Sequence, residues 1–277
     1  MVPRMRDARP AMVLALVLTA TAWGGRTALA VAPAGAVTRS SPHVQPLPEE
    51  SRGVAGRGRD VPACPTARAR RFGSARIAYA AQAIRPLVAY ARPGRRPLAR
   101  FGLLNVNRFP TIFGVVGEVD GAGCRPLWYR VQLPMRPNGT VGYVRARLVR
   151  LRAVSTRIHV DLSRRRLDVF GAGRLIQRLS AAIGAPGTPT PIGRYYVNQL
   201  LRAADPAGPW GPGGLGISAF SPVLVDWPQG GPIGIHGTNL PASIGRAASN
   251  GCLRVDNRMV EWLFRHVPAG TPVVITP

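Results

Sequence analysis

The chain has 277 residues, of which 46% are apolar, so it can form one or two domains with a hydrophobic core and is not a wholly disordered polymer. All 37 basic residues are arginines and the formal net charge is +25, which favours an anionic partner such as a polymer of the cell envelope. The arginines are scattered, and the sequence has no zinc-finger spacing, basic heptad or RNA-binding motif, so we expect no nucleic-acid partner.

Residues 1–30 have the pattern of a secretory signal peptide. Three arginines precede an apolar run from Ala11 to Trp23, and Ala28–Ala30 forms a small-residue cleavage site. The apolar run is short for a membrane span, although an uncleaved membrane anchor is the alternative. We therefore expect export across the cytoplasmic membrane, to the cell wall, the periplasmic space or the medium.

Residues 31–75 are rich in proline, glycine, serine and arginine and lack apolar periodicity, which predicts a flexible linker. The chain has three cysteines, and in an exported protein an odd count predicts one disulfide and one free thiol. The simplest pairing joins Cys64 to Cys124 and leaves Cys252 free. Because there is no C-x-x-C pair and the histidines are dispersed, no metal or other cofactor is expected.

Residues 76–152 are predicted to be all-β, because short strand-like runs are separated by turn sequences such as Asn138-Gly139. A series of this kind is typical of a small barrel. Trp128–Val131 and Asn138–Val144 resemble segments of bacterial SH3-like modules, and this resemblance implies a binding role. The predicted strands cover residues 76–79, 87–90, 111–119, 127–133 and 141–144.

Residues 155–277 are predicted to form a second β-rich domain, with strands near residues 158–162, 167–170, 194–200 and 272–275. A short helix is expected to begin at Asp256 or Asn257 and to end at Gly270. The glycine- and proline-rich stretch Trp210–Leu215 is predicted to be a mobile loop, either a lid over a substrate or a plain surface loop.

Two segments of this second domain carry the residues of a nucleophilic site, Ile235–Asn239 (IHGTN) and Ser249–Val255 (SNGCLRV). Cys252 needs a neighbouring base to form its reactive thiolate, and His236 is the candidate. Gly251 allows backbone N–H groups to approach an oxyanion closely. A cysteine and a histidine at this separation are a weak signal alone, and a buried apolar cysteine with a surface histidine is the alternative.

Four ordered motifs in residues 155–276 resemble the signature of L,D-transpeptidase catalytic domains of the YkuD type: Ile158–Ser163, Thr188–Tyr195, His236–Asn239 and Ser249–Arg254. The resemblance implies that Cys252 is the nucleophile and His236 the base. It also implies a β-rich L,D-transpeptidase fold after the SH3-like module, and so a mainly β chain.

Further roles follow from the same resemblance. The carbonyl of Gly237 is expected to orient the imidazole, and the N–H groups of Gly251 and Cys252 to bind an oxyanion. Asn250 stands where the family often has histidine, so the base assignment depends on His236. The predicted substrate-binding residues are Arg254, Thr238, Asn239, Ser249 and Asn250. The alternatives are a salt bridge within the domain for Arg254, a loop-stabilising hydroxyl for Ser249, and side-chain to backbone bonds that fix the loop for Thr238 and Asn239.

The implied reaction is acyl transfer on peptidoglycan, in which the thiol takes the acyl group of a stem tetrapeptide and an amine of a second stem receives it. Water in place of the amine would make the protein an L,D-carboxypeptidase. A third hypothesis is a wall-binding protein with an inactive catalytic domain, in which the SH3-like module provides the function by binding the wall. The intact pair of Cys252 and His236 disfavours this hypothesis, whereas Asn250 slightly favours it.

Overall fold

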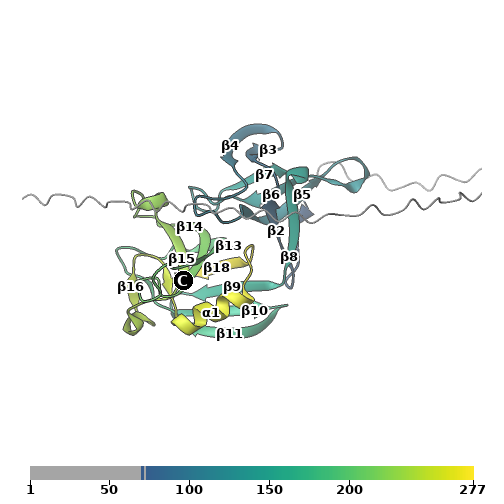
Figure 1. The fold of residues 1–277 in the computed structure, drawn as a ribbon. Helices are drawn as coiled ribbons and strands as arrows, with labels where there is room; N and C mark the ends of the chain where they lie inside the picture. The colour runs from purple at the N-terminus through teal and green to yellow at the C-terminus, as the bar shows by residue number, and fades with distance from the viewer. Residues whose placement is uncertain (1–69, 72) are drawn as a thin grey trace, which may run out of the picture. The chain divides into compact units, whose positions relative to one another are not determined.

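The computed structural model describes residues 70–71 and 73–277, which form a mainly β protein with one α-helix in this described part (Figure 1). The predicted signal peptide, Cys64 and most of the predicted linker lie outside these residues. Arg70–Arg71, predicted as linker, instead form strand β1 beside Gly117 and Glu118. Within the described ranges, no helix has the length and apolar character needed to cross a membrane.

The first sheet has the strand order β4-β3-β7-β6-β5-β2-β8, with β1 paired to β5. Strands were predicted over most of this sheet, and its identity as an SH3-like module stays a prediction. The predicted strands omit β4, whose polar start Arg95-Arg96-Pro97 hides the strand pattern, and also β8. The elements are β2 (Ala78–Ala83), β3 (Leu87–Arg92), β4 (Arg95–Phe101), β5 (Ile112–Asp120), β6 (Pro126–Gln132), β7 (Val141–Arg145), β8 (Val149–Val154) and the 3-10 turns η1 (Ala122–Cys124) and η2 (Ala146–Leu148).

The second sheet begins directly after Ser155 and has the order β11-β10-β9-β18-β13-β14-β15-β17. A separate parallel pair joins β12 to β16. The elements are β9 (Thr156–Asp161), β10 (Arg166–Gly171), β11 (Arg174–Ser180), β12 (Ile183–Gly184), β13 (Gly193–Arg202), β14 (Gly213–Phe220), η3 (Pro228–Gly230), β15 (Pro232–His236), η4 (Pro241–Ser243), β16 (Ala247–Ser249), β17 (Leu253–Arg254), α1 (Asn257–His266) and β18 (Pro272–Thr276).

The prediction of a loop over residues 210–215 is wrong for Gly213–Leu215, which begin β14. Glycine is unfavourable in strands, so its density here pointed to a loop. The structure shows why the strand needs it: a Cβ on Gly214 would lie 2.5 Å from the Cβ of His236 on β15. The glycine therefore allows β14 to lie against the strand that carries the predicted base.

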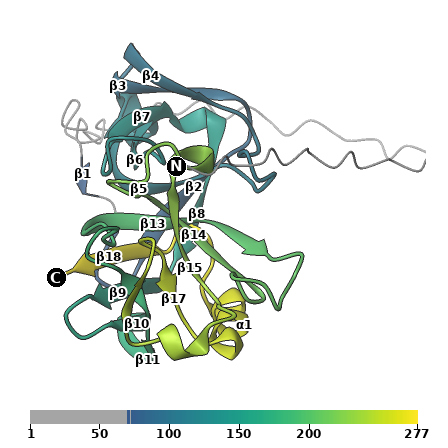
Figure 2. The same ribbon diagram turned by 90° about the vertical axis from the view of Figure 1, so that its left-hand side faces the viewer.

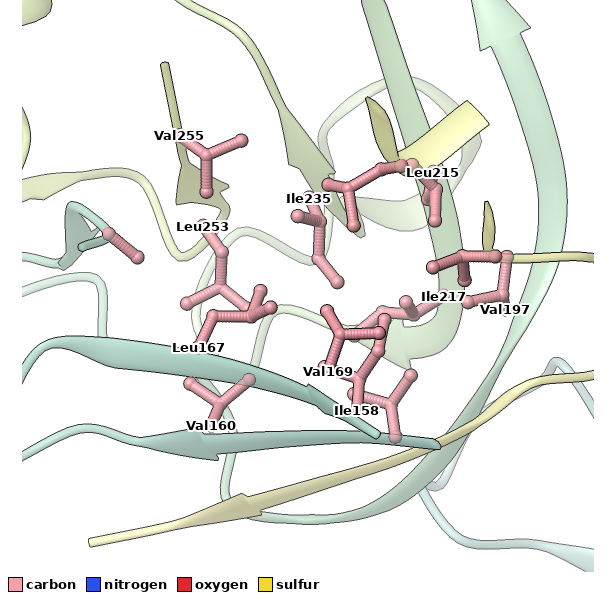
Figure 3. Packing of buried hydrophobic residues seen from close by; sticks show 14 of the residues in the cluster. Ile158, Val160, Leu167, Val169, Val197, Leu215, Ile217, Ile235, Leu253 and Val255 are labelled. Carbon is pink, nitrogen blue, oxygen red and sulfur yellow. The ribbon is translucent and has the colours of Figure 1, made fainter. Parts of the chain in front are cut away.

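The core of the second sheet is built from alternating apolar residues that point to one side of each strand. Figure 3 shows side chains of β9 and β10 opposite side chains of β14, β15 and β17, and all are buried. Helix α1 adds Val260 and Leu263 to this core, and Asp256 caps its first turn by accepting the Arg258 N–H at 2.9 Å. This packing fixes β15 and β17, on which the site is built.

Figure 2 draws the two sheets of residues 73–277, and several hydrogen bonds join them. The buried Tyr196 hydroxyl donates to the Ile112 carbonyl at 3.0 Å. Asn138 accepts from the Phe220 N–H at 2.9 Å and donates to the Phe220 carbonyl at 2.8 Å. Arg136 donates to the carbonyls of Ser221 and Gly230. The first sheet and the loop after β6 are thus bonded to β13, to the end of β14 and to the segment between β14 and β15.

Candidate active site

Cys252 and His236 come from two neighbouring parallel strands. Ile235 pairs with Leu253 and His236 with Arg254, and both Ile235 and Leu253 are fully buried in the core. Because successive residues of a strand point to opposite faces, His236 and Arg254 point away from that core, and so does Cys252, one residue before β17. The strand register therefore brings the predicted nucleophile and base to one face.

The imidazole of His236 is buried and oriented by its own loop. Its Nδ1–H donates to the Gly237 carbonyl at 2.6 Å, the role that was predicted for Gly237. This assignment leaves Nε2 as the free acceptor for a proton. The pKa of His236 is lowered to about 4, mainly by burial and to a smaller extent by the positive charge of Arg254, against the opposing effect of the Gly237 bond. At neutral pH the imidazole is uncharged and can serve as a base.

Cys252 is a free thiol whose Sγ accepts the Gly234 N–H at 3.4 Å. Burial raises the pKa of the thiol above its usual value, while the Gly234 bond and the charge of Arg254 lower it by smaller amounts. The resting pair is therefore a neutral thiol beside a neutral imidazole, and not a thiolate–imidazolium ion pair. Such a thiol reacts when a base removes its proton during the attack.

Ser249 holds the cysteine loop together from inside. Its buried hydroxyl donates to the Cys252 carbonyl at 2.6 Å and accepts the Gly251 N–H at 3.1 Å. Ser249 therefore has the loop-stabilising role that its hydroxyl was expected to suit. The predicted use of the Gly251 N–H needs correction, because this group is already bonded and is not available to an oxyanion. Glycine is required at position 251 for another reason. Its backbone φ is +108°, a conformation that is strained for residues with a side chain.

The predicted Thr188–Tyr195 motif supports the same loop. The Thr188 hydroxyl donates to the Ser249 carbonyl and the Thr190 hydroxyl to the Gly251 carbonyl, both at 2.9 Å. Thr190 also accepts the Gly184 N–H at 2.9 Å. Because these bonds lie on both sides of Asn250, the backbone that leads into Cys252 is fixed at two points.

Thr238 fixes its own loop through a side-chain to backbone hydrogen bond, which was the alternative to its predicted contact with substrate. It is buried, its hydroxyl accepts the Leu240 N–H at 3.0 Å, and its N–H donates to Asn257 Oδ1 at 2.8 Å. The Asn257 amide fills space beside Gly211 and Gly237, where added side chains would collide with it. The sequence suggested Asn257 only as a possible cap for α1, and its role at the His236 loop is visible only in three dimensions.

Arg254 is half-buried beside the pair, and no carboxylate forms an ion pair with it among the described residues. Its Nε is buried without a hydrogen-bond partner, and Nη1 lies 3.5 Å from the Ala248 carbonyl. The alternative of a salt bridge within the domain is therefore wrong for these residues. Asn239 and Asn250 are exposed, and neither lines the cavity at Cys252.

A cavity of about 490 Å³ opens beside Cys252 and is lined in part by Gly234, Trp210 and Trp227. The indole of Trp210 stacks on the imidazole of His236, with ring centroids 4.3 Å apart and an interplanar angle of 26°. Trp210 was predicted only as part of a possible lid. No local pattern marks it as a partner of His236, because the two residues meet through the pairing of β14 with β15.

Other predicted features lie away from this cavity. Cys124 is disulfide-bonded, and its predicted pairing with Cys64 stays a prediction because Cys64 is outside the described residues. Residues 70–71 and 73–277 contain no group of His, Cys, Asp or Glu side chains arranged to hold a metal ion. His159 on β9 is half-buried and bonds to Thr276 Oγ1 at 3.1 Å.

The C-terminal part of the chain is similar to L,D-transpeptidases. Residues 155–275 match the family model of the L,D-transpeptidase catalytic domain, YkuD. The match begins where the second sheet begins.

Relatives with the same family name align with this part of the chain. "Putative L,D-transpeptidase YkuD" of Bacillus licheniformis is 40% identical over 121 residues, and its Bacillus subtilis counterpart 36% over 118 residues. These alignments cover 44% and 43% of this chain but 66% and 64% of the relatives, slightly less than two thirds of their length. A solved L,D-transpeptidase from Mycobacterium smegmatis is 13% identical with a TM-score of 0.39, over 61% of this chain and 92% of that one.

Proposed function

We propose that the protein is a peptidoglycan L,D-transpeptidase that works through a Cys252 thioester. The observation that carries the proposal is the shared face of β15 and β17, on which a free thiol, a neutral imidazole and an unpaired guanidinium lie together. The match to the family model points to the donor, the tetrapeptide stem of peptidoglycan. The neighbouring cavity of about 490 Å³ has room for part of a peptide.

In the first step, His236 Nε2 takes the thiol proton while Cys252 Sγ attacks the carbonyl carbon of the L-centre that precedes the terminal D-residue. The C–N bond then breaks, and the imidazolium returns the proton to the leaving amine. In the second step an amine of another stem attacks the thioester, His236 takes the proton of that amine, and the thiolate leaves. The same proton then restores the Cys252 thiol.

The oxyanion formed in each step needs donors at the position where charge develops. Since Ser249 already accepts the Gly251 N–H, the N–H of Cys252 is our candidate from this loop. Arg254 adds a positive charge that favours negative charge at the sulfur and at the oxyanion. It is not a lining residue of the cavity, so we assign it this electrostatic role in preference to direct binding of a substrate carboxylate.

Export belongs to the same proposal, because peptidoglycan stems lie outside the cytoplasmic membrane. The signal-peptide pattern of residues 1–30 would bring the enzyme to the wall, either free or held by an uncleaved anchor. The net charge of +25 would keep it near anionic envelope polymers, and the SH3-like module would add a wall contact.

Incubation with a disaccharide-tetrapeptide, followed by mass spectrometry, tests the reaction. We expect a cross-linked dimer and an acylated Cys252, and neither product with Cys252→Ala. Tripeptide without dimer would instead indicate an L,D-carboxypeptidase, in which water resolves the thioester. If neither turnover nor acylation of Cys252 is observed, both the transpeptidase and the carboxypeptidase hypotheses are contradicted, and the wall-binding hypothesis is favoured.

A further inference from the structure

A second cavity, of about 440 Å³, adjoins the cavity at Cys252. Four residues line both cavities: Asn107, Gln199, Gln229 and Pro232. Asn107 belongs to the segment between β4 and β5, so the first sheet contributes to the surroundings of the thiol. Three of the four shared residues carry a carboxamide, a group that both donates and accepts hydrogen bonds.

Gln199 is the centre of this amide cluster. Its side chain is only 7% exposed, and its Oε1 accepts from Asn105 Nδ2 at 2.8 Å and from Asn107 Nδ2 at 3.1 Å. Two donors on one oxygen fix which end of the amide is oxygen and which is nitrogen. Asn107 is held in turn by Gln229, whose Nε2 donates to Asn107 Oδ1 at 2.9 Å. The orientation of Gln199 is therefore set by residues of the first sheet.

The Nε2 group of Gln199 has no hydrogen-bond acceptor among the described residues, and nearby Asn198 Oδ1 is buried without a donor. The register of β13 shifts between Val197 and Gln199, and a bulge of this kind re-aims side chains. A Cβ on Gly216 would lie 2.6 Å from Gln199 Nε2 and 2.9 Å from Asn198 Oδ1. One free donor and one free acceptor thus lie over a glycine that lines the Cys252 cavity.

We propose that Gln199 and Asn198 form a subsite for a secondary amide of the substrate, with Gln199 Nε2 donating to its carbonyl and Asn198 Oδ1 accepting its N–H. This inference rests on the proposed function. No Asp or Glu lines either cavity, so the walls suit a neutral amide and not a free amine. Asn105 and Asn107 are positioning residues that present the Gln199 donor.

Peptidoglycan offers this chemistry in two places, the peptide bonds of the stem and the N-acetyl groups of the disaccharide. Both are tested by calorimetric titration of Cys252→Ala, which binds without turnover. The ligands are the free tetrapeptide, the disaccharide without peptide, and the complete disaccharide-tetrapeptide. The fragment whose affinity depends on Gln199 identifies the source of the amide.

In that background, Gln199→Leu removes the donor, and we expect Kd to rise about two- to tenfold, the effect of one lost hydrogen bond. Asn107→Ala leaves Gln199 in place but removes one bond to its Oε1, and a smaller rise is expected. Asn138→Ala is the matched control, because Asn138 also joins the two sheets but lines neither cavity. Thermal melts confirm that each variant is folded.

Equal affinities for the Gln199, Asn107 and Asn138 variants would overturn the subsite, and so would failure of all three ligands to bind. Loss of affinity in Gln199→Leu would support the subsite even if the wild-type protein shows no turnover, because binding is measured without chemistry. Conversely, normal cross-linking with unchanged affinity in Gln199→Leu would leave the proposed function standing and remove only the subsite.

Discussion

His236, the proposed base, stays neutral in mildly acidic solution, because burial lowers its pKa to about 4. A lowered pKa means that the imidazole gains its proton only when pH falls through that value, so the base is present at pH 5 and above. We expect kcat/KM for the tetrapeptide donor to be flat from pH 7 to pH 5 and to fall near pH 4. An acid limb near 6.5, the ordinary histidine value, would contradict this environment.

Trp210 helps to set that low pKa, because its ring covers the imidazole at a centroid distance of 4.3 Å. In Trp210→Ala, water reaches His236 and the desolvation penalty on the charged imidazolium becomes smaller. The pKa of His236 therefore moves up toward its ordinary value. We expect the acid limb of kcat/KM to shift upward by about one pH unit or more. Trp227→Ala is the control, since Trp227 lines the cavity without a recorded ring contact to His236. An unmoved limb in Trp210→Ala would mean that the ring does not shield the imidazole.

Arg254 acts on Cys252 through its charge. Its guanidinium lowers the pKa of the thiol, so Arg254→Gln should raise that pKa and slow alkylation by iodoacetamide about three- to tenfold at pH 8. Arg254→Lys retains the positive charge and should recover part of the rate. The exposed Arg246 provides a control, and Arg246→Gln should react like the wild type. Equal rates in all four proteins would contradict the electrostatic role.

Two neighbouring residues at the start of helix α1 have different roles. Asp256 stabilises the helix as its cap, and Asn257 positions the His236 loop. Asp256→Ala removes the cap and should lower the free energy of unfolding by about 1 kcal/mol, with kcat unchanged. Asn257→Ala removes the acceptor of the Thr238 N–H and opens space beside Gly237. Because the His236 loop then loosens, we expect kcat to fall about tenfold. Denaturant unfolding and turnover, measured on both variants, test this contrast, and equal kcat values would refute it.

Some secondary-structure elements can be predicted from the sequence, and others cannot. The alternation of Ile158 and Val160 predicted β9, and the spacing of Val260 and Leu263 predicted α1, since both patterns record burial on one face. Strand β14 was missed because its glycines are chosen for close approach between strands, which a local pattern does not reveal.

Only some residues of the candidate site can be predicted from the sequence. Cys252 and His236 lie in recognisable motifs, and their loop contacts fall within those motifs. Trp210, Gln199 and Asn257 join them only through strand pairing and loop packing, so no spacing in the sequence predicts their positions.

At the scale of the whole molecule, residues 73–277 contain two main apolar clusters, one in each sheet, and a smaller one that includes Ala80, Ile112 and Val154. Tyr196 links the sheets: its ring lies against Gly114 of β5, and its buried hydroxyl donates to the Ile112 carbonyl. Burial also raises the pKa of this hydroxyl well above its usual value, so it remains a donor at pH values at which an exposed tyrosine ionises.

Tyr196→Phe should therefore destabilise both sheets together. The change leaves the Ile112 carbonyl without this donor, and we expect a loss of about 1–2 kcal/mol in the free energy of unfolding. Native-state hydrogen exchange measures the effect separately in β5 and β14, and equal losses are expected if the sheets unfold as one unit. Tyr195→Phe provides the comparison, because the Tyr195 hydroxyl bonds to Ile192, in the catalytic part of the chain. A loss confined to β14 in Tyr196→Phe would show that the sheets unfold independently, and that the first sheet does not depend on this contact for its stability.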